Sequence, residues 1–296
     1  MITLNAKKIL IPIDFSEISL RAIRHGAFIA KLTQGELILL HVQSKNELLD
    51  IMLPVINITD LSAITKLLKE KLDKLADDTR REYGIDVVSI VSSGNITAEI
   101  VNIADTYQAG MIVMGTQGAN SSSDLFLGSN AYRVLTLSEI PVMTVRTEVP
   151  RIGYSKILLP IDTSYHSRQK VVTALQIADK FSAQVHVLGI LAPHEEHEFK
   201  LKVILPQIEK MAQERNLVCT SEIIKTRRRA EETLACADHI NADLIVCMRD
   251  ETTEFPRNIL GTYAHSLLNN AKIPVLCIPP EIHPENFEPD SIGGMW

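Results

Sequence analysis

An internal repeat is the feature of this sequence that most constrains its fold. The segment Lys8–Asp14 recurs 148 residues later as Lys156–Asp162. The segment Ala109–Met114 recurs 133 residues later as Ala242–Cys247, and the whole 109–146 block aligns with its second copy without a gap. Two copies of one unit of about 145 residues fit the chain length of 296.

We therefore expect two tandem domains followed by a tail. The first domain should cover residues 1–148 and the second 154–280, because Pro150 and Gly153 mark a boundary between them. Residues 281–296 are polar, with two prolines and two glycines, and should form a loose tail.

Short apolar runs alternate with amphipathic segments within each unit. The apolar runs are typical of strands buried on both faces of a sheet, and the amphipathic segments have helical spacing. This alternation predicts an α/β fold in which each unit forms a parallel sheet with helices on both faces. In the first unit we expect strands at 8–13, 36–42, 86–92, 110–114 and 141–146, and helices at 16–32, 60–83, 97–107 and 129–138.

Local signals refine the helices. Asp14 and Glu17 have the spacing of a capping box at the start of the first helix, and Gly84 is typical of a C-cap. The second unit repeats the order of elements. Its least regular stretch is 195–216, where Pro206 interrupts the helical pattern and the apolar residues from Phe199 to Leu205 alternate.

Charge and hydropathy exclude several function classes. The chain has 30 basic and 36 acidic residues, and each half carries a net charge of −3, so bulk binding of nucleic acid is disfavoured. A small anion held by backbone amides stays open, because that needs no net positive charge. No apolar run approaches the ~18–20 residues that span a bilayer, and Ile9–Ile13 is too short for a signal peptide, so we expect a cytoplasmic protein without membrane contact.

The clearest chemical signal follows the fourth predicted strand. There the sequence has the pattern G-x2-G-x9-G-S, formed by Gly115, Gly118 and the pair Gly128–Ser129. Gly115 and Gly118 can take a positive φ and let a ligand approach the main chain. Gly128 and Ser129 stand at the start of the next helix, where free N–H groups and the helix dipole favour a phosphate. A Gly/Ser-rich connection without a ligand is the alternative interpretation.

With this loop in view, the sequence resembles the universal stress protein family, specifically a tandem member with two such domains. The resemblance rests on Pro12–Ser16 after the first strand, His41–Val42 ending the second, the glycine pattern from Gly115 to Ser129, and Ile140–Val142 opening the last strand. It implies a five-stranded, doubly wound sheet in the order 3-2-1-4-5 in each domain.

The resemblance also implies a ligand, because family members with this glycine pattern resemble those that bind ATP. The first domain would then bind ATP or a related adenine nucleotide, with or without Mg²⁺. Asp14 and the Val42 backbone would face the adenine and ribose, and the glycine loop would hold the ribose and phosphates. The full set of candidate nucleotide-binding residues is Pro12, Asp14, Val42, Met114, Gly115, Gly118, Gly128, Ser129 and Asn130.

Family dimers pair their last strands. A tandem chain could make that pairing internally, between 141–146 and 273–278, and two such chains could also associate as a homodimer. A nucleotide that orders the 115–129 loop would change a surface that an unknown protein partner recognises, which predicts a stress-response regulator working by population shift.

The second unit departs from the glycine pattern. Met248 stands where Gly115 does and Glu251 where Gly118 does, while Gly261–Thr262 survives. A methionine side chain would fill the space that a close approach to the backbone needs, and a glutamate would repel a phosphate. We therefore expect one competent site and one degenerate site per chain.

Weaker signals keep alternatives open. The run Arg227–Arg229 could bind an anion beside the degenerate loop, or be a solvated turn. His194 and His197 lack the spacing of a zinc motif, so we expect no metal site. The cysteines should be small buried hydrophobes without a disulfide; they are Cys219, Cys236, Cys247 and Cys277.

No group of residues has the spacing of a catalytic site, so an enzyme is not expected beyond slow ATP hydrolysis. Two rival functions remain: a binding scaffold that has lost nucleotide, and a slow ATPase or autophosphorylating protein that uses Ser121–Ser123.

Overall fold

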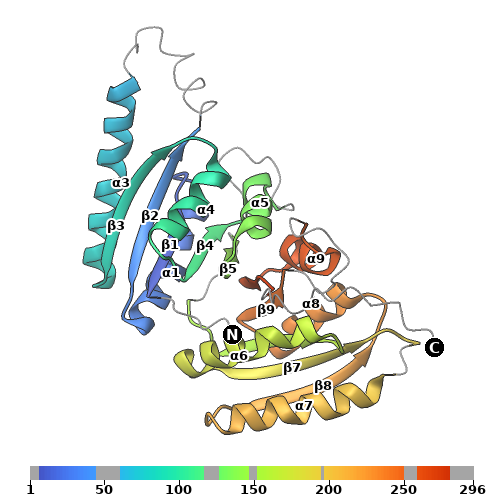
Figure 1. The fold of residues 1–296 in the computed structure, drawn as a ribbon. Coiled ribbons are helices and arrows are strands. Elements are labelled where there is room, and N and C mark those ends of the chain that lie inside the picture. Colours follow the sequence, from blue (N-terminus) through green and yellow to red (C-terminus); the bar gives the residue numbers. More distant parts are fainter. Residues whose placement is uncertain are drawn as a thin grey trace, which may run out of the picture.

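The computed structural model describes residues 7–44, 61–116, 127–146, 152–194, 197–249 and 259–280 (Figure 1). The predicted roles of Gly118, Ser121–Ser123, Glu251 and the tail 281–296 fall on residues outside these ranges. The first repeat comprises β1 (Lys8–Pro12), α1 (Glu17–Thr33), β2 (Glu36–Gln43), α3 (Leu61–Tyr83), β3 (Asp86–Ser93), α4 (Ile96–Thr106), β4 (Met111–Gly115), α5 (Ser129–Leu137) and β5 (Val142–Val145). The second comprises β6 (Lys156–Ile161), α6 (Tyr165–Phe181), β7 (Gln184–Leu191), α7 (Glu198–Gln213), β8 (Cys219–Lys225), α8 (Arg229–Ile240), β9 (Leu244–Met248), α9 (Thr262–Asn270) and β10 (Val275–Ile278).

The described strands form one mixed sheet in the order β3-β2-β1-β4-β5-β10-β9-β6-β7-β8. Neighbouring strands within each repeat are parallel, and each repeat has the order 3-2-1-4-5 that the family resemblance implies. The two repeats join through β5 and β10, which are antiparallel with Met143 opposite Leu276. The predicted internal pairing of the last strands is therefore confirmed.

Helices cover both faces of this sheet (Figure 1). Residues of α1, α3, α6 and α7 pack into the core on one face, and residues of α4, α5, α8 and α9 pack into the core on the other. β1 shows why: Ile9 and Ile11 belong to the first core, Leu10 belongs to the second, and all three are fully buried. Each such side chain contributes about 1.5–3 kcal/mol through burial, so both faces of each repeat stabilise its fold.

The local signals have mixed outcomes. Gly84 has φ +67° and its N–H donates to the Arg80 carbonyl, as a C-cap should. The predicted interruption at Pro206 is wrong, because α7 runs through it as one helix. Its buried residues are spaced by three and four positions, so packing against the sheet overrides the local alternation; they are Leu201, Ile204, Leu205, Ile208 and Ala212.

Two arginines fasten the repeats to each other beside the β5–β10 pair. Arg146 donates from Nη2 to the Asn269 carbonyl at the end of α9. Arg249 donates from Nη1 to the Ser138 carbonyl at the end of α5, at 2.7 Å. The last carbonyls of a helix lack partners within it and carry partial negative charge. Each repeat thus supplies a cation to the final helix of the other.

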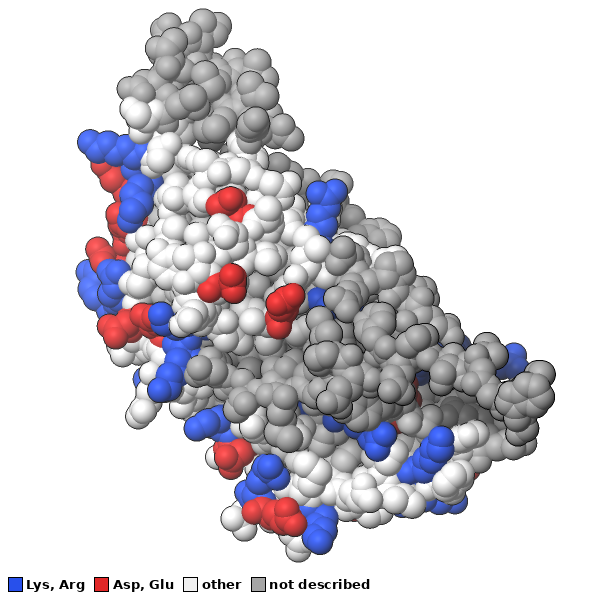
Figure 2. Space-filling view, in the orientation of Figure 1, with Lys and Arg blue, Asp and Glu red and all other residues white. Residues whose placement is uncertain are grey.

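Charged side chains of both signs mix on the surface. In Figure 2, basic and acidic groups intermingle along α3, where Lys69 pairs with Asp73 and Arg80 pairs with Asp77. In the described part of the chain, no helix combines the length and apolar character needed to span a bilayer.

Candidate functional site

The first repeat has a topological switch point between β1 and β4. These strands are parallel neighbours, but the chain leaves β1 toward β2 on one side and leaves β4 toward β5 on the other. Ligands of open α/β sheets bind in the crevice beyond the carboxyl ends of such strands. Two of the predicted site residues lie there, since Asp14 follows β1 and Gly115 ends β4.

The turn between β1 and α1 differs in detail from the prediction. Ser16 is the N-cap of α1, and its Oγ accepts a hydrogen bond from the N–H of Ser19 at 3.3 Å. The predicted capping box is therefore wrong, because Asp14 lies two residues before the cap and Glu17 pairs with Arg21 instead. Asp14 Oδ1 accepts from the N–H of Ser16 at 3.0 Å and stays exposed at the edge of the sheet.

Phe15 adds backbone strain to this turn. Its φ of 61° lies in the left-handed region, which is unusual for a bulky residue. Its ring centroid lies 5.0 Å from that of His41, whose Nδ1 donates to the Ile13 carbonyl at 2.7 Å. Strained residues tend to gather at functional sites, where the surrounding packing holds them. Sequence reasoning missed this feature, because φ is not visible in residue identity.

The glycine loop is closed at its base by a backbone hydrogen bond. The N–H of Gly128 donates to the Thr116 carbonyl at 2.7 Å, which brings the two ends of the loop together. Gly115 does not adopt the positive φ that a glycine allows, because it continues the extended backbone of β4. Gly115 therefore differs from the neighbouring residues of β4 in having no side chain, and not in its backbone conformation.

The start of α5 has backbone N–H groups that can serve as donors. Gly128 is its N-cap with φ −62°, and no side chain of the described residues caps this end. Ser129 and Asn130 are exposed in its first turn. The first N–H groups of a helix have no partner within it, so together with the helix dipole they can bind an anion.

The other predicted residues lie within or at the ends of strands. Val42 and Met114 are buried side chains of β2 and β4 in the core that faces α4 and α5. Pro12 ends β1 and is half-buried. At this edge, Val42 and Met114 can therefore offer only main-chain groups or an apolar wall.

Comparison with known proteins adds the family. The model of the universal stress protein family matches residues 5–146 and again 153–279. The chain belongs to the universal stress protein family. It carries two such units in tandem, which confirms what the motifs implied.

Some relatives match about half of the chain, and one solved structure matches nearly all of it. Universal stress protein MJ0531 of Methanocaldococcus jannaschii is 34% identical over 147 residues, which cover 47% of this chain and 82% of that protein. Universal stress protein YxiE of Bacillus subtilis is 27% identical over 153 residues, which cover 47% of this chain and 98% of that protein. The crystal structure of a universal stress protein from Archaeoglobus fulgidus covers 95% of this chain and 98% of its own, with a TM-score of 0.73 and 19% identity. The tandem fold is thus shared with a solved structure.

In the second universal-stress-type unit, side chains fill the equivalent edge. Arg229 Nη2 donates to Asp162 Oδ2 at 2.7 Å, and its guanidinium lies 5.0 Å from the centre of the Tyr263 ring. The Tyr263 hydroxyl lies 2.9 Å from Thr233 Oγ1. Met248, the counterpart of Gly115, is fully buried. These contacts occupy the positions that carry the predicted site in the first unit.

The charge of Asp162 depends on these contacts. Burial alone raises the pKa of its carboxyl, but the hydrogen bonds from Ser164 and the positive charge of Arg229 outweigh it and lower the pKa below its usual value. The carboxylate is therefore ionised and paired, whereas its counterpart Asp14 is exposed.

The arginine run has partners already. Arg229 pairs with Asp162, and Arg228 lies 3.2 Å from Glu231 and 3.6 Å from Glu232. These ion pairs leave less uncompensated charge for an anion, which favours the structural interpretation of Arg228 and Arg229. Arg227 Nη2 lies 3.2 Å from His194 Nε2. Sequence reasoning could have anticipated the Arg229 pair, because the 133-residue offset aligns Arg229 with the apolar Ile96.

The cysteines follow the prediction only in part. Cys247 and Cys277 are buried, but Cys219 and Cys236 are partly exposed. Cys219 belongs to β8 and Cys236 to α8. Among the described strands, β8 is the last of the sheet and pairs with β7 alone.

Proposed function

We propose that the first repeat binds ATP or a related adenine nucleotide beyond the carboxyl ends of β1 and β4. The observation that carries this proposal is the start of α5, at the same edge of the sheet as the exposed Asp14. Gly128 is its N-cap, Ser129 is exposed, and no side chain in the described part of the chain caps this end. The N–H groups of the first turn suit the phosphates. The carboxylate of Asp14 suits a ribose hydroxyl, because an ionised carboxylate accepts hydrogen bonds and donates none.

The second repeat supports a single site per chain. Its counterpart of Asp14 is paired with Arg229, and its counterpart of Gly115 is the buried Met248. A nucleotide there would have to break an ion pair and displace a packed side chain. The proposed regulatory role rests on a nucleotide-dependent surface of the first repeat that a partner would recognise. The second repeat would not supply such a surface, because its own side chains fill the equivalent edge.

The first test is the ligand that accompanies the purified protein. Freshly purified chain is denatured, and released small molecules are identified and quantified by mass spectrometry. We expect ATP or ADP at close to one equivalent per chain. A universal stress protein has been solved in complex with cAMP, so titrations of nucleotide-free protein should compare ATP, ADP and cAMP by calorimetry. Two equivalents per chain would contradict the single site, and no binding of any of the three would favour the nucleotide-free scaffold.

A matched pair of variants then locates the site. Ser129→Ala removes a hydroxyl at the start of α5, and Thr262→Ala makes the equivalent change in the second repeat. A hydrogen bond to a charged group contributes about 1.5–3 kcal/mol. We expect Ser129→Ala to weaken ATP binding by about tenfold and Thr262→Ala to leave it unchanged. Equal effects of the two variants would rule out the assignment to the first repeat.

A further inference from the structure

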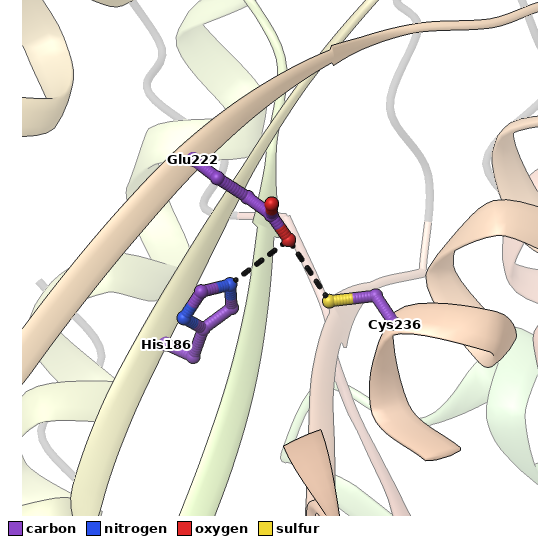
Figure 3. Close-up of side chains that lie close together, drawn as sticks. All are labelled: His186, Glu222 and Cys236. Atoms are coloured by element: carbon purple, nitrogen blue, oxygen red, sulfur yellow. Dashed lines mark hydrogen bonds and ion pairs between the residues drawn. The ribbon is translucent and has the colours of Figure 1, made fainter. Parts of the chain in front are cut away.

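Three potential metal ligands converge on the outer part of the second repeat (Figure 3). His186 comes from β7, Glu222 from β8 and Cys236 from α8, and their ligand atoms all lie within 4.8 Å of one another. His186 Nε2 lies 3.2 Å from Glu222 Oε1, and Cys236 Sγ lies 3.5 Å from the same oxygen. The cluster is remote in sequence and in the sheet from the proposed nucleotide site.

The residues of the first repeat that align with this cluster are all apolar. The strand registers align His186 with Ile38 and Glu222 with Ile90, and the repeat offset aligns Cys236 with Ile103. Ile38 is buried in the core, and Ile90 and Ile103 pack against it. The same fold is thus satisfied by three aliphatic side chains in one repeat. Packing therefore does not explain three polar ligands in the other, since polar groups lose hydration when they are covered.

Two of the three ligand–ligand distances fit tetrahedral coordination. Zinc binds cysteine sulfur at about 2.3 Å and histidine nitrogen or carboxylate oxygen at about 2.0–2.2 Å. Two such ligands at a tetrahedral angle are then about 3.3–3.6 Å apart. The separations from Glu222 Oε1 to His186 Nε2 and to Cys236 Sγ are 3.2 and 3.5 Å. The ligand atoms of His186 and Cys236 lie within 4.8 Å of each other, so they would approach when an ion binds.

The surroundings supply a second layer of contacts and an entry path. His186 Nδ1 lies 2.8 Å from Thr220 Oγ1, so with Nε2 on a metal the Nδ1–H can donate to this hydroxyl. Metal-bound histidines usually have such a partner for the other ring nitrogen. The His186 side chain is 14% exposed and that of Glu222 is 49% exposed, so solvent reaches the cluster from the Glu222 side.

We propose that His186, Glu222 and Cys236 form a binding site for a divalent ion of the zinc type, with the fourth position open to water. One thiolate and one carboxylate balance the charge of the ion. The mixed nitrogen, oxygen and sulfur ligands favour Zn²⁺ over Mg²⁺ or Ca²⁺, which prefer oxygen ligands alone. The site is independent of nucleotide binding, and it departs from the expectation that the chain binds no metal.

Binding requires the Cys236 thiol to lose its proton. On binding, the sulfur–hydrogen bond breaks, sulfur keeps the electron pair and coordinates the ion, and the proton goes to solvent. Metal affinity should therefore increase with pH.

The test uses the full chain after treatment with a chelator that is then removed. Zn²⁺ is titrated by calorimetry, and Co²⁺ is used as a spectroscopic substitute because a thiolate ligand gives it a charge-transfer absorption band. We expect one Zn²⁺ per chain. Cys236→Ser should weaken binding at least 100-fold and abolish the charge-transfer band, whereas Thr220→Val should weaken binding about 10- to 100-fold.

Two controls separate this site from other metal binding. Cys219→Ser makes the same chemical change on β8 outside the cluster, and it should leave affinity and spectrum unchanged. The triple variant His186→Ile, Glu222→Ile and Cys236→Ile copies the packing of the first repeat, so it should fold and bind no Zn²⁺. Absence of Zn²⁺ binding by the unmodified chain, or equal affinity in Cys236→Ser, would overturn the proposal and leave a hydrogen-bonded cluster only.

Discussion

The carboxyl edges of the two repeats have similar backbones but different side chains. Each edge closes its loop with one backbone hydrogen bond, from Gly128 to Thr116 at 2.7 Å and from Gly261 to Arg249 at 3.2 Å. In the first repeat the carboxylate after the first strand is exposed, and in the second it is paired with Arg229 beneath Tyr263. The comparison teaches that strand order and loop closure can persist while a few side chains decide whether the edge is open.

The largest expected effect comes from making the first edge resemble the second. Gly115→Met introduces the residue that the second repeat carries at position 248. We expect ATP affinity to fall at least 100-fold, or about 2.7 kcal/mol, because the side chain occupies the space through which a ligand would approach the main chain. Calorimetry measures the affinity. Urea unfolding should show a chain that remains folded, since Met248 is accommodated at the end of β9.

The matched control is Met248→Leu in the second repeat. It replaces one buried side chain by another of similar volume, which should cost less than about 1.5 kcal/mol of stability. ATP affinity should not change. If Gly115→Met bound ATP as tightly as the unmodified chain, the difference between the two edges would not lie at this position.

The next largest effect is on stability, and it comes from breaking the Arg229–Asp162 ion pair at the carboxyl edge of the second repeat. Arg229→Met removes the cation that pairs with the Asp162 carboxylate, which is 16% exposed, and leaves Lys170 as the other positive charge that lowers its pKa. Breaking a buried pair costs about 3–5 kcal/mol, and the partial exposure of Arg229 reduces our expectation to about 2 kcal/mol of unfolding free energy. Arg228→Met is the control, because Arg228 is exposed and should cost less than about 0.5 kcal/mol.

The pH dependence of this ion pair has a defined sign. The pKa of Asp162 is lower in the folded chain than in the unfolded one, so its pairing stabilises the fold above the unfolded pKa, about 3.9. This contribution disappears as pH falls through the folded pKa. Urea titrations at several pH values should therefore show the difference between Arg229→Met and the unmodified chain shrinking on acidification below about pH 4. A difference that grew on acidification would show that Arg229 stabilises the fold by another route.

The layout of the fold follows from the sequence because it depends on local patterns. The apolar runs and helical spacings predicted the first-repeat elements to within one residue at each end, and the recurrence of Lys8–Asp14 predicted two units. Those signals arise because each strand is buried on both faces, which requires a continuous apolar run in both repeats.

The errors and omissions concern contacts that local patterns do not encode. The choice of Ser16 over Asp14 as N-cap depends on where α1 begins. The Arg229–Asp162 pair joins residues 67 positions apart, and the metal-ligand cluster joins two strands and a helix. Comparing the repeats position by position would have marked both, because a polar residue stands where the other copy has an aliphatic one.

The smallest expected effect tests what the two repeats share. Ser16 and Ser164 are the N-caps of α1 and α6, and each also donates its hydroxyl to the preceding aspartate, at 2.5 and 2.6 Å. Ser16→Ala and Ser164→Ala should each cost about 1 kcal/mol of unfolding free energy, measured by urea unfolding. Equal costs would mean that the cap belongs to the common scaffold. A cost at Ser164 that exceeded the other by more than about 1 kcal/mol would couple the cap to the Asp162–Arg229 pair, and the filled edge would then stabilise the second repeat in addition to blocking a ligand.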